Sequence, residues 1–433
     1  MVGPGRNYAC LPASTEDKGG VWSLLVGFIS SSATDNGFLG LHRLRVAASG
    51  RILGRSEDTL ELLEDTLLPP QIRGATAMPT SDDGRSALCL FISEKPAVAG
   101  DPAVQRLRPL QLHLDLNAAA AESSRRRVTV FDTMPDVPLE PLMRTRPVFA
   151  AGRLWAPCFS EHFGPPRLLM KHLDEDAGGR WTWADVAAVN LPIERGEQIG
   201  GFAGRFLHGY AVVDGGTTIL LSLQQPVLFV AFDCTTGTWA HVITAETSWE
   251  DSSHYLPNVP IRERGVYVEE DDTIYFLCGG TLFAYRLCRD EGRGEYRMAP
   301  PVEVACLCPL AQDEGYGFVT HLGGRLMCSV WIGVTLRCSC CDAKHVLITT
   351  FRVDDGGGHG QFVPIGVKVI HSTCRRLDIS PGKPSESHCE FCFLQEYAEI
   401  DQKIQCCSRG QKLQPTVMWL NPPTICYLVA GNF

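Results

Sequence analysis

Cysteine is the residue type with the greatest chemical potential in this chain of 433 residues. Twelve of its 18 cysteines lie between positions 306 and 426. Within this stretch, Cys389 and Cys392 are followed, after thirteen further residues, by the adjacent Cys406 and Cys407. A structural zinc site usually needs two well-spaced pairs, and adjacent cysteines rarely both bind one ion. We therefore predict no metal and no other cofactor, and keep a zinc- or redox-responsive protein as an alternative.

No signature of a common catalytic site accompanies the cysteines. The sequence contains no Gly-x-Ser-x-Gly elbow, phosphate-binding loop, His-Glu-x-x-His motif or dinucleotide fingerprint. Its 12 histidines are scattered singly, and the acidic run Glu269–Asp272 is typical of a solvated turn. The sequence therefore predicts a protein that is not an enzyme and has no catalytic residues.

A polar and aromatic segment is the best candidate for binding another protein. Trp249, His254 and Tyr255 lie in the stretch SWEDSSHYLPNVP, on a long connection between strand-like segments. Aromatic residues of this kind are favoured as anchors of protein interfaces. The alternative, that these rings pack on the edges of neighbouring sheets, stays open. Further candidates on long connections are Glu161, His162, Phe163 and Arg262 to Arg264.

The composition is that of a folded protein with a large core. Apolar residues make up 45% of the chain and charged residues 20%, and the net charge is −10. This charge argues against binding to nucleic acid or to an anionic membrane. The apolar run at residues 21–29 is too short to span a bilayer, and no basic segment of a signal peptide precedes it. We expect a monomer in the cytoplasm or nucleus, with reduced cysteines and an unknown protein partner.

The elements that must position these residues recur along the chain. An apolar strand, a tight acidic or glycine turn and a second apolar strand form a repeated hairpin signature. Its turns are centred on Asp83–Gly84, Gly152, Gly215, Asp272 and Gly323. A second strand–turn–strand unit follows each hairpin, with copies at residues 126–139, 167–186, 227–242, 281–298 and 345–365. Each period therefore carries about four strands, which is typical of a propeller blade.

The N-terminal stretch around Lys18–Gly20 fits the same template and adds one blade. The sequence thus predicts an all-β fold, a β-propeller of six four-stranded blades. Residues 56–68 interrupt the pattern, because Leu60, Leu63 and Leu67 fall on one face at helical spacing. We expect a short surface helix or an irregular connection there.

Two blade phrases carry a family resemblance. TIYFLCGGTLFAYRL and FVAFDCTTGTWAHV resemble kelch repeats, in which a strand ends in Gly–Gly and a Phe–Asp turn precedes a tryptophan. The layout is similar to the kelch-like and F-box-associated propellers of plants, over roughly residues 20–375. The resemblance implies that Trp239, and Trp181 or Trp183, pack between neighbouring sheets. Asp233 and Asp132, of the Phe–Asp pairs, are expected to form turns.

The resemblance also implies a function. Propellers of this kind serve as substrate receptors of ubiquitin ligases, although this chain has no recognisable F-box. We therefore expect a non-catalytic protein-interaction scaffold, related to such adaptors. Galactose-oxidase-like enzymes share the kelch architecture, so an enzyme with its site in the funnel of the propeller is kept as a second alternative.

The chain is expected to divide into a propeller at residues 1–379 and a Cys-rich segment at residues 380–433. A Pro/Ser/Gly-rich stretch, ISPGKPSESH, joins the two. A propeller must close its ring, often by adding a strand from one terminus to the blade formed by the other. We predict that Thr416–Leu420 or Thr424–Val429 closes the ring on the N-terminal blade.

Overall fold

The computed structural model describes the strand-forming parts of the chain, at residues 21–31, 37–54, 60–68, 72–82, 85–94, 106–113, 127–130, 148–160, 167–175, 181–191, 207–223, 228–244, 259–290, 294–308, 315–333, 344–354, 366–377 and 388–399. The only helical element among them is one 3₁₀ turn, η3 (Glu269–Asp271). Nothing helical in these ranges is long or apolar enough to cross a membrane. The fold is all-β, as predicted.

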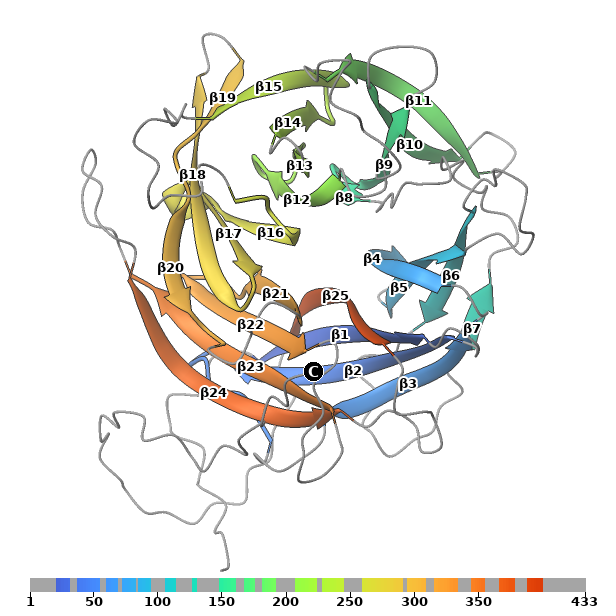
Figure 1. The fold of residues 1–433 in the computed structure, drawn as a ribbon. Coiled ribbons are helices and arrows are strands. Elements are labelled where there is room, and N and C mark those ends of the chain that lie inside the picture. The colour runs from blue at the N-terminus through green and yellow to red at the C-terminus, as the bar shows by residue number, and fades with distance from the viewer. Residues whose placement is uncertain are drawn as a thin grey trace, which may run out of the picture.

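The described strands form five sheets, which lie around a common centre in Figure 1. Four of them contain four strands each. The N-terminal sheet has the order β25 (His388–Glu399), β1 (Val21–Ser31), β2 (Gly37–Ala47) and β3 (Glu61–Leu68). The next has the order β4 (Ile72–Asp82), β5 (Arg85–Glu94), β6 (Arg106–His113) and β7 (Arg127–Val130). The third has the order β8 (Val148–Ala150), β9 (Arg153–Ser160), β10 (Arg167–Glu175) and β11 (Trp181–Asn190). The last has the order β21 (Gly315–His321), β22 (Leu326–Gly333), β23 (Lys344–Val353) and β24 (Val367–Leu377).

The fifth sheet contains nine strands and closes on itself. Its order is β17 (Thr273–Cys278), β16 (Glu263–Val268), β12 (Leu207–Val213), β13 (Thr218–Leu223), β14 (Leu228–Asp233), β15 (Thr238–Thr244), β19 (Glu295–Met298), β18 (Thr281–Asp290) and β20 (Val302–Cys306). Because β17 also pairs with β18, eight of these strands form a closed barrel, and β20 is added to β18.

The barrel joins two units that the sequence predicts as separate sheets. Two parallel seams connect them, β12 with β16 and β15 with β19. Gly209 of β12 makes the first seam possible, because a β-carbon at this position would lie 2.4 Å from the carbonyl oxygen of Ile261. At this position the neighbouring backbone comes too close for a side chain, so glycine is required.

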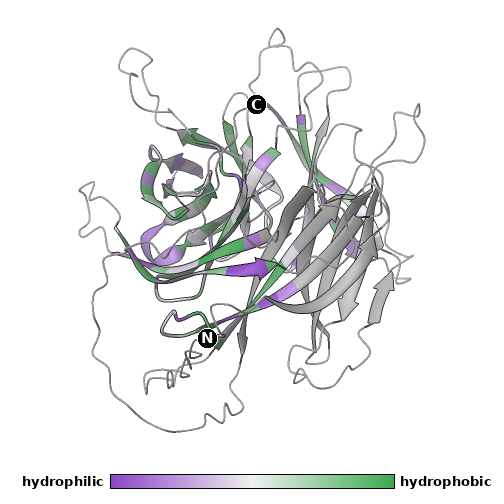
Figure 2. Ribbon diagram, turned by 60° about the horizontal axis from the view of Figure 1, so that its bottom comes forward, coloured by the Kyte–Doolittle hydropathy of each residue, from purple (hydrophilic) through white to green (hydrophobic). Residues whose placement is uncertain are grey.

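The inner strands β13 and β22 and the outer strand β24 differ in burial. β13 and β22 have strand neighbours on both sides and are buried along their whole length, so TILLSL and LMCSVWIG are apolar without strict alternation. At the end of its sheet, β24 alternates between exposed and buried residues toward its C-terminus. In Figure 2, hydrophobic and hydrophilic residues accordingly alternate along several of the coloured strands.

Apolar clusters fill the spaces between consecutive sheets. Leu24 and Val26 of the N-terminal sheet pack in one cluster with Phe318 and Ile348 of the β21–β24 sheet. The β8–β11 sheet shares a second cluster with strands β12–β15, and the barrel encloses a third. These contacts bury apolar faces of the sheets that form the clusters, which is the main stabilising contribution to such a fold.

The five hairpins predicted from turn residues are all confirmed. The strands on either side of each turn pair antiparallel, as β4–β5, β8–β9, β12–β13, β16–β17 and β21–β22. Among the second units, β10–β11, β14–β15 and β18–β19 also pair as predicted. The second half of the unit at residues 345–365 lies outside the described residues, and the strand after it that pairs with β23 is β24, which begins at Val367.

The helix expected within residues 56–68 is also wrong. Residues 61–68 form β3, which pairs antiparallel with β2. The leucine spacing is compatible with a helix, but pairing with β2 outweighs that local preference. Leu60, just before the strand, is buried in the cluster beneath the sheet, and its N–H donates to the carbonyl of Arg376.

A strand from the C-terminal segment pairs with the first of the described strands. β25 runs antiparallel to β1, with Ser31 opposite His388 and Val21 opposite Glu399. The two segments that the sequence suggested for this role, at residues 416–420 and 424–429, lie outside the described residues.

Candidate interaction surface

Four hairpin turns share an uncommon backbone conformation. Ala151, Asp214, Asp272 and Arg325 have φ angles of 49°, 52°, 51° and 66°, in the left-handed region. They lie in the turns of β8–β9, β12–β13, β16–β17 and β21–β22. This region costs a non-glycine residue roughly 1–2 kcal/mol. The same cost recurs at the same place in four hairpins, because tight hairpin turns need positive φ to match strand twist.

Consecutive turns of this set touch one another. The N–H of Ala151 donates to the carbonyl of Gly216 in the next turn, at 2.8 Å. A β-carbon built on Gly215 would lie 3.8 Å from Oε1 of Glu269, in the turn after that. The turns at residues 151–152, 214–217 and 269–272 thus lie side by side, and the charge of Arg325 links the turn at residues 323–325 to Asp271 electrostatically. We call these four turns together the turn rim.

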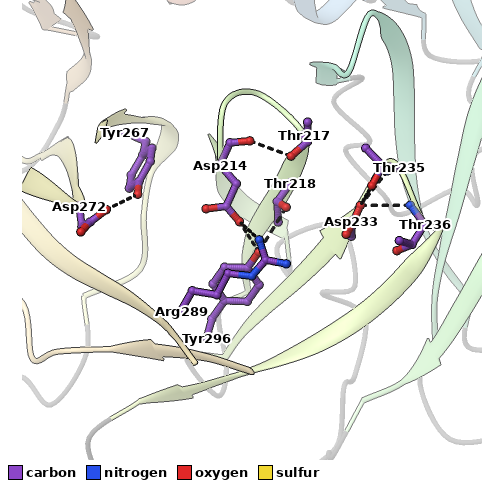
Figure 3. A network of polar contacts seen from close by, with 10 residues as sticks. All are labelled: Asp214, Thr217, Thr218, Asp233, Thr235, Thr236, Tyr267, Asp272, Arg289 and Tyr296. Atoms are coloured by element: carbon purple, nitrogen blue, oxygen red, sulfur yellow. Dashed lines mark hydrogen bonds and ion pairs between the residues drawn. The ribbon is translucent and has the colours of Figure 1, made fainter. Parts of the chain in front are cut away.

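A buried tyrosine and an exposed arginine anchor the turn rim at Asp214 (Figure 3). The carboxylate accepts hydrogen bonds from the hydroxyl of Tyr296 and from Nη1 of Arg289, the latter at 3.4 Å. Tyr296 is buried, and its hydroxyl also lies 3.3 Å from Oγ1 of Thr218. Burial and the contact with Asp214 raise the pKa of Tyr296 to about 12, so its phenol stays a neutral donor.

Two further tyrosines hold the acidic turn at residues 269–272. Tyr267 donates to Oδ1 of Asp272 at 2.8 Å (Figure 3), and Tyr275 donates to Oδ2 of Asp271 at 3.0 Å. Burial raises the pKa of Asp271, against the lowering effect of Tyr275 and of the charge of Arg325 in the neighbouring turn. The turn rim is therefore built on fixed side chains, while carboxylates of the same turn reach the solvent.

The exposed charge of the turn rim is mainly negative. Glu269, Glu270 and Asp272 are exposed, and Asp214 and Asp271 are half-buried. The acidic run that the sequence predicts as a solvated turn therefore becomes part of a larger surface. Sequence reasoning missed this surface, although the positive-φ turn residues of each hairpin carried the signal.

Asp233 forms the turn expected of it. Its Oδ1 accepts from the N–H of Thr235 at 2.8 Å, from the hydroxyl of Thr235 at 2.6 Å and from the N–H of Thr236 at 3.1 Å (Figure 3). Partial burial would raise the pKa of Asp233, but these hydrogen bonds outweigh it and the pKa is lowered. Its partner in the Phe–Asp comparison, Asp132, lies outside the described residues.

Trp239 lies between two sheets. Its indole N–H donates to the carbonyl of Ala187 in β11 at 3.2 Å, and its ring packs edge-on against Phe232, with centroids 4.9 Å apart. Trp183 packs against a small cluster formed by Ala156 and Cys158. Both tryptophans contribute to packing in this structure.

The predicted binding residues Trp249, His254 and Tyr255 lie outside the described residues, as do Glu161 to Phe163. The chain that follows the first three is firmly held. The N–H of Val259 donates to the hydroxyl of Tyr285 at 2.8 Å, and the same hydroxyl donates to the carbonyl of Val259 at 2.6 Å. The next bond, from the N–H of Ile261 to Oγ of Ser222, is 3.0 Å long. Arg262 is exposed at the end of this anchor.

The cysteine pair that suggested zinc lies in a strand. Cys389 and Cys392 belong to β25, and three residues of extended chain separate two α-carbons by about 10 Å. A C-x₂-C zinc pair needs a turn that brings both sulfurs to one ion, about 2.3 Å from each. Cys406 and Cys407 are not among the described residues, and within those residues no group of three or more His, Cys, Asp or Glu side chains could hold a metal.

A family model described as a protein of unknown function (DUF1668) matches residues 100–368, more than half of the chain. The chain belongs to the DUF1668 family. The matched region runs from before β6 into β24 and contains the whole turn rim. The comparisons show this family and not a kelch or F-box-associated one, so that resemblance stays a prediction.

No curated protein matches this DUF1668 protein. A functionally unknown protein from Desulfotomaculum acetoxidans aligns with a TM-score of 0.35 and 8% identity, over 80% of this chain and 89% of that chain. Hsv2 of Kluyveromyces lactis aligns with a TM-score of 0.34 and 10% identity, over 80% of this chain and 99% of that one. TM-scores this low support no inference about fold or function.

Proposed function

We propose that this DUF1668 protein is a non-catalytic scaffold that binds another protein through the turn rim. The observation that carries the proposal is the row of four turns, each with a non-glycine residue at positive φ, two of which are also held by buried tyrosines. Tight hairpin turns hold the backbone of this surface in a defined conformation. A rigid surface also loses little conformational entropy when a partner binds.

We further propose that the sheets are the blades of a six-bladed, kelch-like propeller. If the two halves of the closed barrel are counted as separate units, the described strands form six units of four, and β20 is an additional strand. The pairing of β25 with β1 supports this idea, because it joins the end of the described chain to its beginning. On this view, the turn rim is one end of the propeller, where such proteins commonly bind partners.

The charge of the turn rim favours a protein partner with a basic surface. Its exposed carboxylates would repel the phosphates of nucleic acid, in agreement with the net charge of −10. Complementary charge speeds association and selects among partners. The related proposal, that the partner is a substrate presented to a ubiquitin ligase, rests only on the resemblance to F-box-associated propellers.

A charge-reversal experiment tests the proposal. The double variant Glu269→Lys, Glu270→Lys changes two exposed residues of the turn rim, and Glu303→Lys changes an exposed residue of β20 as a control. The tagged proteins are expressed in cells of the source organism, and co-purifying proteins are quantified by mass spectrometry. Some proteins should co-purify with both the wild type and the control. We expect the recovered amount of these proteins to be about ten-fold or more lower with the double variant, because the loss of close charge pairs at an interface weakens binding by at least this factor. Equal recovery by all three proteins would contradict the proposal.

A further inference from the structure

The first and last four-stranded sheets meet at a contact that depends on a histidine. After β2 the chain turns back at residues 47–54, a segment that we call the latch segment, and it lies against β23 and β24. The N–H of Ile52 donates to Nδ1 of His371 at 3.0 Å, across 319 positions of sequence. The hydroxyl of Thr350 donates to the carbonyl of Gly50, and Nη2 of Arg375 lies 3.4 Å from the carbonyl of Leu53.

Apolar packing makes the fit of the latch segment tight. Ile52 is buried in the cluster that joins the two sheets, and Ile370 packs against that cluster. A β-carbon on Gly50 would lie 2.7 Å from Cδ1 of Ile370. The latch segment therefore has little freedom to shift while the contact is intact.

The hydrogen bond from Ile52 determines the protonation state of His371. Nδ1 can accept an N–H only through its free lone pair, so the ring must be neutral with its proton on Nε2. An imidazolium carries protons on both nitrogens and accepts nothing. After protonation, the N–H of Ile52 and the new N–H at Nδ1 would therefore be two donors that face each other in a half-buried contact.

The charges around His371 oppose protonation as well. Burial of the ring lowers its pKa from the ordinary value of 6.5, and the positive charges of Arg51 and Arg375 lower it further. Arg51 comes from the latch segment and Arg375 from β24 itself, while the residue of β23 opposite His371 is the uncharged Thr350. An unfolded chain then binds a proton here at a higher pH than the folded one. Stability from this contact is present above pH 6.5 and is lost as the pH falls.

We propose that His371 is an acid-sensitive latch between the first and last four-stranded sheets, and that its protonation releases the latch segment from β24. β25 stays paired with β1 on the far side of the N-terminal sheet, so release opens one contact and leaves the sheets intact. The loosened state exposes Ile52 and the edge of β24, where Val369 is already exposed.

Hydrogen exchange at the latch segment tests this proposal. Exchange of peptides that contain Ile52 is followed between pH 7.5 and pH 5.0 and corrected for the intrinsic change in rate. In His371→Asn, the side-chain oxygen can replace Nδ1 as an acceptor but cannot be protonated in this range. His241→Asn, in the exposed part of β15, removes a histidine far from the contact.

We expect the wild type and His241→Asn to lose protection at low pH. The loss should be about ten-fold for each unit by which the pKa of His371 is lower in the folded state than in the released state. His371→Asn should keep its protection. Equal loss in His371→Asn, or no loss in the wild type, would overturn the proposal. If His371→Asn does not fold, nitrogen NMR of the wild-type ring decides the question, because a proton on Nδ1 at pH 7.5 contradicts the latch.

Discussion

The anchor between Tyr285 and Val259 allows a sharp prediction for Tyr285→Phe. The tyrosine is fully buried, and its hydroxyl both receives the N–H and donates to the carbonyl of the same residue. Removing the hydroxyl leaves two buried backbone groups of Val259 without this partner. The ring itself should keep its stacking on Phe276, with centroids 5.6 Å apart, so the apolar packing changes little.

The expected cost follows from these two groups. A buried polar group that loses its partner costs about 1–3 kcal/mol, and a water molecule entering the space of the hydroxyl would place the cost near the lower end. We expect Tyr285→Phe to lower the free energy of unfolding by about 2–4 kcal/mol. The amide of Val259, four residues after the predicted binding residue Tyr255, should also exchange faster.

Urea unfolding, followed by tryptophan fluorescence and by circular dichroism, measures this loss. Tyr267→Phe is the matched control, since its hydroxyl donates at 2.8 Å to the exposed Asp272. Water can replace that bond, so the control should lose less than about 1 kcal/mol. If both variants lose the same free energy, or if Tyr285→Phe loses none, then the buried anchor does not stabilise the chain around Val259 and the reasoning is refuted.

Three further predictions concern other parts of the fold. Gly209→Ala should destabilise by about 1–3 kcal/mol through overpacking at the β12–β16 seam, seen as a lower midpoint of thermal unfolding. Gly366→Ala should cost less, because the atom nearest to the added β-carbon, at 3.0 Å, is the terminal Oδ2 of the exposed Asp354, which can move away. An equal cost for both variants would contradict the argument about the seam. Asp233→Ala should lower stability by about 1 kcal/mol in urea unfolding at neutral pH, and the difference from the wild type should shrink as acid protonates the wild-type carboxylate. Cys328 should resist alkylation by iodoacetamide in the folded protein, because complete burial raises the pKa of its thiol. The exposed Cys288 should be alkylated before Cys328. Early labelling of Cys328 would show that its sheet opens.

Local turn chemistry made the hairpins predictable from sequence. A turn residue that tolerates positive φ, flanked by two apolar runs, has few other stable conformations, so Gly152, Gly215 and Gly323 located their hairpins correctly. The hydrogen bonds of Asp233 are also local and span only three residues, which is why its role as a turn former could be predicted.

Contacts between distant segments could not be predicted in the same way. Residues 61–68 have helical leucine spacing and became a strand because β2 lies beside them. The sequence by itself determined an all-β chain made of hairpins, because each hairpin depends on residues close together in the chain. Only the tertiary structure decided that two units would join into a barrel, that the turns of neighbouring sheets would form one rim and that Ile52 would meet His371. These features depend on how sheets pack and on pairs up to hundreds of positions apart, for which neighbouring residues carry no signal.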